Sequence, residues 1–91
     1  MSYKLVFAPR ALNDLEKIKK SGNKSSLNKL QIILRELMEH PTSGIGNPEL
    51  LRKRANTYSR RLNGKDRIVY SIHDDVVCVN ILQMLGHYDD K

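Results

Sequence analysis

Two stretches of helical periodicity organise the first half of the chain. Between Pro9 and Lys20, apolar residues recur at helical spacing with charged residues between them, and proline suits the first turn of a helix. A second, clearer stripe runs from Ser26 to about Glu39, and Pro41 ends it. The two stripes predict an antiparallel helix pair that buries Leu12, Leu15 and Ile18 from the first helix and Leu27, Leu30, Ile33, Leu34, Leu37 and Met38 from the second.

The other apolar segments are typical of strands. Residues 3–8, "YKLVFA", form one short candidate before the helices. After them, "TYSRRLN" and "RIVYSIH" flank Asn63-Gly64, a strong hairpin signal, and a nearly continuous apolar run at residues 76–85 predicts a third, central strand covered by the helices. We also expect one short helical turn within "PELLRKRAN". The order β-α-α-β-β-β predicts an α+β fold, with two N-terminal helices packed on a curved, mainly antiparallel sheet.

Length and composition are those of one small domain spanning residues 1–91. Apolar residues make up 40% of the chain and charged residues 29%, which favours a globular fold over disorder. The single cysteine, Cys78, cannot form an internal disulfide, and no segment approaches the roughly 18 apolar residues that span a membrane. The apolar run near the start is shorter than a signal peptide requires, so we expect a cytoplasmic protein.

Positive charge is concentrated in the middle of the chain. The net charge is +6, and residues 44–70 hold seven lysines and arginines against Glu49 and Asp66, which gives this segment a net charge of +5. Residues 71–91, in contrast, hold four aspartates and one lysine. A basic segment of this density favours a polyanionic partner, most often nucleic acid, although a solvated surface rich in lysine and arginine explains the same charge.

Three arginines flank the predicted hairpin. Since residues two apart in a strand share a face, one of Arg60 and Arg61 should lie on the open face of the sheet, near Arg67. Two guanidinium groups that converge there would fit the oxygens of a phosphate. The alternative is that these charges only prevent edge-to-edge association of the sheet.

The candidates for proton transfer are one histidine and one carboxylate. His87 follows the last predicted strand and stands beside Tyr88, whereas the other two histidines lie at a helix end and in a turn. Glu49 is isolated in the basic segment just after a loop rich in glycine and proline, so it is either an ion-pair partner of the arginines or a positioned base. No metal-binding or nucleotide-binding motif is present, and we expect neither a metal nor a cofactor.

Four short motifs occur in a recognisable order. They are "GIGNPELLR", "YSRRL", "DRIVYSI" and the final "HY", and they extend over residues 44–88, about half of the chain. In this order and spacing, the chain resembles the Txe/YoeB toxins of the RelE/ParE superfamily, which are the toxin halves of bacterial toxin–antitoxin modules. The helices resemble those of the family in pattern only.

The resemblance implies a ribosome-dependent, metal-independent endoribonuclease that cleaves mRNA and so inhibits translation. It makes Glu49 the general base, His87 the general acid and Arg67 the group that stabilises charge on the phosphorus, while Tyr88 supports the site. The RNA 2′-OH would be the nucleophile, so these groups suffice for general acid–base cleavage. The residues expected to bind RNA are Arg52, Lys53, Tyr58, Arg60, Arg61 and Lys65.

The resemblance also implies partners. These are mRNA on the ribosome, the ribosomal RNA of the A site, and an acidic antitoxin encoded by the adjacent gene, which would cover Arg60, Arg61 and Arg67. A homodimer is a further candidate assembly, and no membrane partner is expected. Two other functions remain open: a non-enzymatic poison of DNA gyrase, as in the ParE branch, and a nucleic-acid-binding or partner-binding module without activity.

Overall fold

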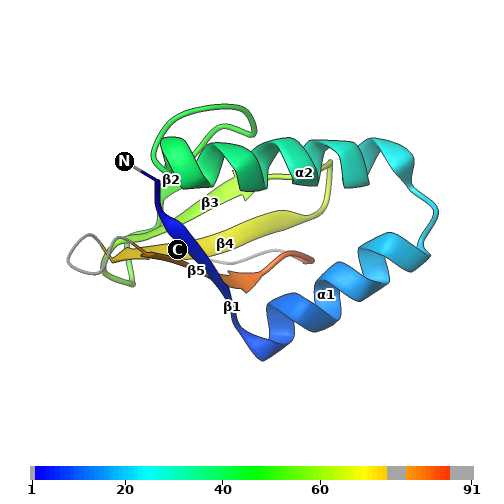
Figure 1. Cartoon of the computed structure of the whole chain (residues 1–91), viewed down its shortest axis with the longest axis horizontal. Coiled ribbons are helices and arrows are strands. Elements are labelled where there is room, and N and C mark those ends of the chain that lie inside the picture. Colours follow the sequence, from blue (N-terminus) through cyan, green and yellow to red (C-terminus); the bar gives the residue numbers. More distant parts are fainter. Residues whose placement is uncertain (1, 74–77, 87–91) are drawn as a thin grey trace.

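The computed structural model places two helices against a five-stranded sheet (Figure 1). It describes residues 2–73 and 78–86. The elements are β1 (Lys4–Phe7), α1 (Pro9–Lys20), α2 (Lys24–Glu39), β2 (Glu49–Leu50), β3 (Thr57–Arg61), β4 (Arg67–His73) and β5 (Cys78–Gln83). The α+β class and the two N-terminal helices are therefore confirmed.

The strands follow the order β1-β5-β4-β3-β2 across the sheet. β1 pairs with β5 in parallel, with Lys4 opposite Cys78, and every other neighbouring pair is antiparallel. The sheet is thus mainly antiparallel, as predicted. β5, which covers residues 78–83 of the apolar run expected to form a central strand, does lie inside the sheet, between β1 and β4.

Residues 48–56 differ from the prediction. The expected helical turn is wrong, because Glu49 and Leu50 form an edge strand opposite Ser59 and Tyr58, and bends and a turn follow. The Leu51 N–H donates to the Thr57 carbonyl at 2.8 Å and extends this pairing by one step. Pairing with β3 satisfies backbone groups along the edge of the sheet, which a helical turn at this place would leave unpaired.

The core lies between the helices and the middle of the sheet. Its buried apolar residues are Ala11 and Ile18 of α1, Leu30, Ile33 and Leu37 of α2, Leu62, Ile68, Tyr70 and Ile72 around β4, and Ile81 and Met84 at β5. Leu12 and Met38, predicted to be buried, are 51% and 38% exposed. The short helix α1 buries only a narrow stripe formed by Ala11, Asp14 and Ile18. Leu12 follows Ala11 and is therefore rotated about 100° around the helix axis away from that residue, which leaves its side chain exposed.

The hairpin predicted at Asn63-Gly64 is present, with a five-residue connection between Arg61 and Arg67. The Asn63 side chain organises this loop: its Oδ1 accepts the N–H groups of Lys65 and Asp66 at 3.0 and 2.9 Å. Side-chain bonding of this kind lets asparagine stand in for a backbone turn. The loop brings the end of β3 back to β4 with Arg61 directly opposite Arg67.

Candidate nucleic-acid site on the open face of the sheet

The face of the sheet opposite the core, the open face, carries Glu49 of β2, Arg61 of β3 and Arg67 of β4, next to a buried centre formed by Thr57, Ser59 and Val69. Arg61 lies opposite Arg67, and Ser59 lies opposite both Glu49 and Val69. Because paired residues in an antiparallel ladder point to the same side, Glu49, Arg61 and Arg67 share one face. The prediction that one of two adjacent arginines lies beside Arg67 is confirmed, and that residue is Arg61.

Glu49 and Arg67 are in contact on this face. The Arg67 Nη1 lies 3.4 Å from Glu49 Oε2, and the two side chains are 20% and 57% exposed. An ion pair this open to water contributes little to stability, so a charged ligand can replace either partner at small cost. The contact fits both interpretations left open by the sequence, an ion pair and a base held beside a cation.

The end of β5 passes beside Arg67. The Gly86 carbonyl accepts the backbone N–H of Arg67 at 3.1 Å, and the Gly86 N–H donates to Asp66 Oδ1 at 3.0 Å. Gly86 has a φ of +88°, a conformation that favours glycine. His87 and Tyr88, predicted as the general acid and its support, lie outside the described residues; the residue before them is fixed next to Arg67.

Arg60 is fully buried on the core side of β3. Its Nη1 donates to Glu36 Oε1 at 2.7 Å, and its Nη2 donates to the carbonyls of His40 and Ser43 at 3.0 and 2.8 Å. Its Nε donates to the Tyr70 hydroxyl at 3.2 Å. The prediction that Arg60 contacts RNA does not agree with this environment, because every nitrogen of the guanidinium already has a protein acceptor. We assign Arg60 a structural role.

Tyr58 lies on the same side of the sheet as Arg60. Its ring stacks on Tyr70 with centroids 6.0 Å apart and packs, partly buried, against the core. The prediction that Tyr58 stacks on RNA bases therefore does not fit its place in the fold. Burial raises the pKa of Tyr70 above its usual value near 10, although the hydrogen bond from Arg60 opposes that shift, and the neutral phenol donates to the Pro41 carbonyl at 2.8 Å.

The loop before β2 is held by the same buried cluster. The Ile45 N–H donates to Glu36 Oε1 at 3.0 Å, and the Gly46 carbonyl accepts the Arg61 N–H at 2.6 Å. Gly44 has a φ of +131°, and a Cβ at this position would collide with Glu36 Oε1. The glycine-rich loop thus follows a fixed path that delivers β2 to the edge of the sheet.

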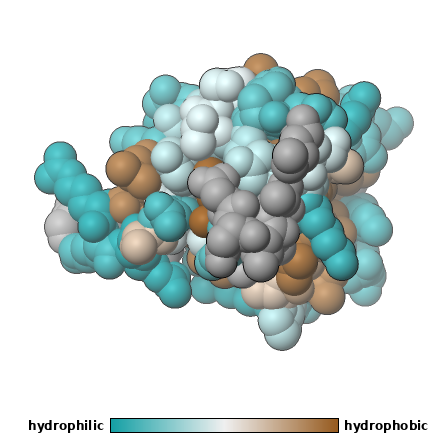
Figure 2. All heavy atoms as spheres, turned by 60° about the vertical axis from the view of Figure 1, so that its left-hand side comes forward, coloured by the Kyte–Doolittle hydropathy of each residue, from teal (hydrophilic) through white to brown (hydrophobic). Residues whose placement is uncertain are grey.

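The other residues predicted to bind RNA are at exposed positions in the segments that connect β2, β3 and β4. Arg52 and Lys53 belong to the irregular segment between β2 and β3, and Lys65 belongs to the β3–β4 loop. In the view of Figure 2 most of the surface is hydrophilic, and hydrophobic residues appear in separate small groups.

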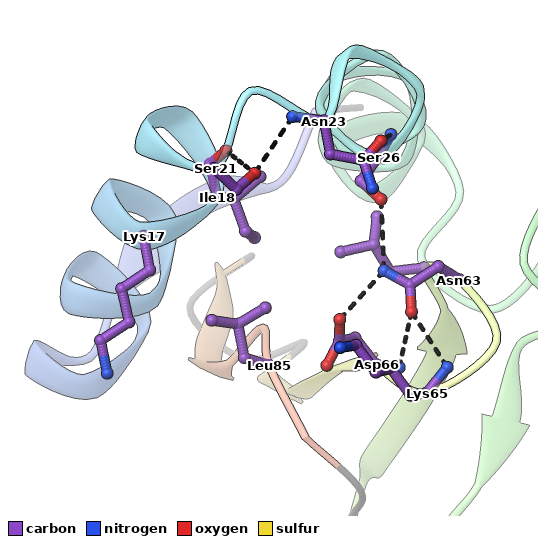
Figure 3. Close-up of a pocket in the computed structure, with 10 residues that line it drawn as sticks. Lys17, Ile18, Ser21, Asn23, Ser26, Asn63, Lys65, Asp66 and Leu85 are labelled. Atoms are coloured by element: carbon purple, nitrogen blue, oxygen red, sulfur yellow. Dashed lines mark hydrogen bonds between the residues drawn. The ribbon is translucent and has the colours of Figure 1, made fainter.

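A cavity of about 480 Å³ borders the site on the helix side (Figure 3). It lies among the end of α1, the start of α2, the β3–β4 loop and Leu85. Lys17 and Lys65 line it, and the Asn63 side chain bridges Ser26 and Asp66 along one wall. Leu85 and Asp66, which border Gly86, form part of the wall, so the cavity and the end of β5 share residues.

Sequence reasoning missed two carboxylates beside the site, Asp14 and Asp66. Asp14 is only 4% exposed, and its Oδ2 accepts the N–H groups of Met84 and Leu85 at 3.1 and 3.3 Å. Asp66 accepts the Gly86 N–H. The sequence did hold one signal: Asp14 falls on the apolar stripe of the first helix. A carboxylate buried there requires hydrogen-bond donors around it, which predicts a structural contact at this position.

Two features of the described ranges, 2–73 and 78–86, bear on the kind of site. No group of three or more His, Cys, Asp or Glu side chains is arranged there to hold a metal ion. Within the same ranges, neither helix has the length and apolar character needed to cross a membrane.

Comparison with known families gives one match that covers most of the chain. The family described as "YoeB-like toxin of bacterial type II toxin-antitoxin system" matches residues 7–88. A curated relative, the toxin YoeB of Synechocystis sp., is 35% identical over 54 residues. That alignment covers 58% of this chain and 63% of the relative, so the matched part spans less than two thirds of the relative's length.

Solved structures of similar proteins cover nearly the whole fold. The YoeB/ParE toxin from Agrobacterium tumefaciens has a TM-score of 0.81 and 26% identity, over 93% of this chain and 99% of that one. The YoeB dimer from Staphylococcus aureus has a TM-score of 0.78 and 28% identity, over 97% and 100%. The heterotetrameric YoeB-YefM toxin-antitoxin complex from the same organism has a TM-score of 0.76 and 29% identity, over the same shares.

Proposed function

Because this chain belongs to the family of YoeB-like toxins of bacterial type II toxin–antitoxin systems, we propose that it is an endoribonuclease that cleaves mRNA on the ribosome. One observation carries the proposal. Glu49 lies 3.4 Å from Arg67 on the open face, and the backbone of Arg67 is bonded to Gly86, the residue before His87. This contact and this bond support the proposed roles of Glu49 as base, Arg67 as cation and the residue after Gly86 as acid.

In the proposed reaction, Glu49 removes the proton of the 2′-OH, and the resulting alkoxide attacks the adjacent phosphorus. Arg67 stabilises the added negative charge on the phosphoryl oxygens, for which its planar guanidinium is well suited. His87 protonates the departing 5′-oxygen, and Tyr88 supports the phosphate. The products are a 2′,3′-cyclic phosphate and a 5′-hydroxyl, and no step requires a metal ion.

RNA binding is proposed for the exposed cations around this face. Arg61 lies directly opposite Arg67, and Arg52, Lys53 and Lys65 lie at exposed positions in the flanking loops. Arg60 and Tyr58 are left out of this set because they face the core. Contacts of lysine and arginine with phosphates position the RNA without reading its sequence, so the choice of codon must come from the ribosome or from other residues.

The partner proposed for regulation is an acidic antitoxin segment that covers Arg61 and Arg67. The Staphylococcus aureus relative has been solved with YefM as a heterotetrameric toxin-antitoxin complex, which supports this proposal. A disordered acidic segment that folds on binding would match a basic open face by charge. The same relative has also been solved as a dimer, and light scattering of this chain alone tests whether it self-associates.

Translation in vitro with a defined mRNA tests the activity. The wild-type chain is expected to create new 5′ ends within the codons at the ribosomal A site, mapped by primer extension, and to leave the same mRNA intact without ribosomes. Intact mRNA in the presence of translating ribosomes would contradict the proposal. Accumulation of cleaved DNA–gyrase complexes with intact mRNA would instead favour the gyrase-poison alternative.

A further inference from the structure

The segment that follows β5 is held by side chains from distant parts of the chain. β5 ends at Gln83, and the sheet offers no ladder partner to the next amides. Asp14 of α1 accepts the N–H groups of Met84 and Leu85 at 3.1 and 3.3 Å, and Asp66 accepts the N–H of Gly86 at 3.0 Å. Two carboxylates therefore bind three consecutive backbone amides.

The carbonyls of this segment are bound as well. The Leu85 carbonyl accepts Arg10 Nη2 at 3.3 Å and Gln83 Nε2 at 3.2 Å, and the Gly86 carbonyl accepts the Arg67 N–H at 3.1 Å. The Arg10 Nε also lies 3.5 Å from the Asp14 carboxylate. The N–H groups of Met84, Leu85 and Gly86 and the carbonyls of Leu85 and Gly86 thus all have hydrogen-bond partners outside the ladder.

The two carboxylates are fixed by their own surroundings. Asp14 lies on the buried stripe of α1 and is 4% exposed. The second oxygen of Asp66, Oδ2, accepts Asn63 Nδ2 at 3.0 Å within the β3–β4 loop, and Figure 3 shows the Asn63 side chain directed at Asp66. Hydrogen bonds to ionised acceptors are stronger than neutral ones, so this arrangement resists movement of the segment.

We propose that Asp14 and Asp66 are positioning residues: they fix the exit of the chain from β5 at Gly86, beside Arg67, and cleavage by the proposed general acid, the next residue, depends on this fixed exit. This inference rests on the proposed function, since it assigns the two carboxylates an effect through the general acid. Neither carboxylate touches the RNA. Their effect on the rate comes from the geometry of the segment they bind, and misplacement of a reacting group by about 1 Å can cost about 10²-fold in rate.

Single-turnover cleavage of mRNA on programmed ribosomes, with full-length variants, tests the inference. Asp66→Ala removes the acceptor of the Gly86 N–H and should slow cleavage about 10- to 100-fold, with binding to ribosomes unchanged. Glu16→Ala, an exposed position of α1, makes the same change in net charge without touching the segment and should cleave at the wild-type rate. Thermal unfolding of each variant shows that the comparison is between folded proteins.

A charge exchange within the β3–β4 loop separates positioning from general structural damage. Asp66→Asn places two amide nitrogens against each other at the Asn63 contact and should also slow cleavage. The double variant N63D/D66N restores one acceptor and one donor in this pair and leaves an oxygen for the Gly86 N–H, so the rate should recover.

Asp14→Asn is the matching variant for the other carboxylate. It keeps an acceptor oxygen for the N–H groups of Met84 and Leu85, so it should retain most of the cleavage rate. It also avoids the folding defect expected of Asp14→Ala.

A double-mutant cycle with His87 decides whether the carboxylate acts through the general acid. In a His87→Gln background, Asp66→Ala should cause no further loss of rate. An equal loss in both backgrounds, or a wild-type rate for Asp66→Ala, would overturn the inference while the ribonuclease proposal stands. A wild-type rate for His87→Gln would overturn the proposed general acid itself, and the positioning role with it.

Discussion

Adjacent residues of β3 have opposite roles because strand alternation points them to opposite faces. Arg60 faces the core, where Glu36, Tyr70 and the loop carbonyls accept its hydrogen bonds. Arg61 is exposed on the open face, opposite Arg67. The same residue type therefore serves folding at one position and is available to a ligand at the next.

Substitution of these two arginines should separate stability from RNA binding. Arg60→Ala leaves Glu36 and several carbonyls without their donor, and breaking a largely buried ion pair costs about 3 kcal/mol in the free energy of unfolding. Arg61→Ala should change that free energy by no more than about 0.5 kcal/mol but weaken binding to RNA. Urea unfolding and RNA titration of both variants check this, and equal stability of the two proteins would contradict the structural role of Arg60.

The contact of Glu49 with Arg67 fits two roles for Glu49, a general base and an ion-pair partner. Glu49→Gln keeps the shape and can still accept a hydrogen bond, but it cannot take up a proton at neutral pH. If Glu49 is the general base, cleavage on ribosomes should fall by about 10²-fold or more while RNA binding survives. Cleavage by Glu49→Gln at the wild-type rate would mean that the residue is only an ion-pair partner of Arg67.

At the scale of elements, the loop of residues 40–48 depends on a close approach of backbone to side chain. Gly44 combines a φ of +131° with a position at which a Cβ would overlap the Glu36 carboxylate. The loop leads directly to β2, so a shift at Gly44 is transmitted to the strand that carries Glu49. The buried cluster around Arg60 thereby determines the position of the Glu49 carboxylate on the open face.

Gly44→Ala should destabilise the protein by about 1–3 kcal/mol, because it adds both backbone strain and a steric clash. Cleavage should also fall, since Glu49 moves with the loop. Gly64→Ala is the matched control: nothing lies within 4 Å of a Cβ at Gly64, and its stability should stay within about 0.5 kcal/mol of the wild type. Chemical denaturation and ribosome cleavage assays of both variants measure the two effects, and a fully stable Gly44→Ala would argue against a fixed loop.

Elements with a strong periodic signal were predictable from the sequence, and those defined by pairing were not. The second helix and the Asn63-Gly64 hairpin were expected from apolar spacing and turn chemistry, and both are present. β2 is only two residues long and exists because β3 offers it an edge, which no local pattern reveals. Alternation required Arg60 and Arg61 to face opposite sides, but only the packed helices determine which side is the core.

At the scale of the whole molecule, the proposed attraction to RNA comes from the basic residues of the middle segment that are not buried. Of the seven basic residues between positions 44 and 70, Arg60 is buried and Arg54 is exposed but has no assigned role. The proposed RNA contacts are the other five, Arg52, Lys53, Arg61, Lys65 and Arg67. The electrostatic attraction to RNA therefore rests on about five cations. Its strength must decrease as salt increases, because each phosphate contact releases condensed counterions.

Affinity for single-stranded RNA should fall with salt at a log–log slope of roughly −3, from about 0.7 per neutralised phosphate and four or five contacts. The double variant R61A/K65A should reduce that slope by about 1.4. K19A/K20A, which removes the same charge from the end of α1, should leave it almost unchanged. Fluorescence anisotropy between low and physiological salt measures all three slopes, and a flat response of the wild type would mean that this face does not bind RNA electrostatically.

The parallel pairing of β1 with β5 also determines when the molecule can be completed. Lys4 and Cys78 are partners although 74 residues separate them, and β1 has no other neighbour in the sheet. Translation adds about 5–20 residues per second, so the first strand waits about 4–15 seconds for its partner. The Gly86–Arg67 bond forms only after that strand is made. During its own synthesis, the nascent chain therefore holds Glu49 and Arg67 about 1–4 seconds before Gly86 is added and the site around them can be completed.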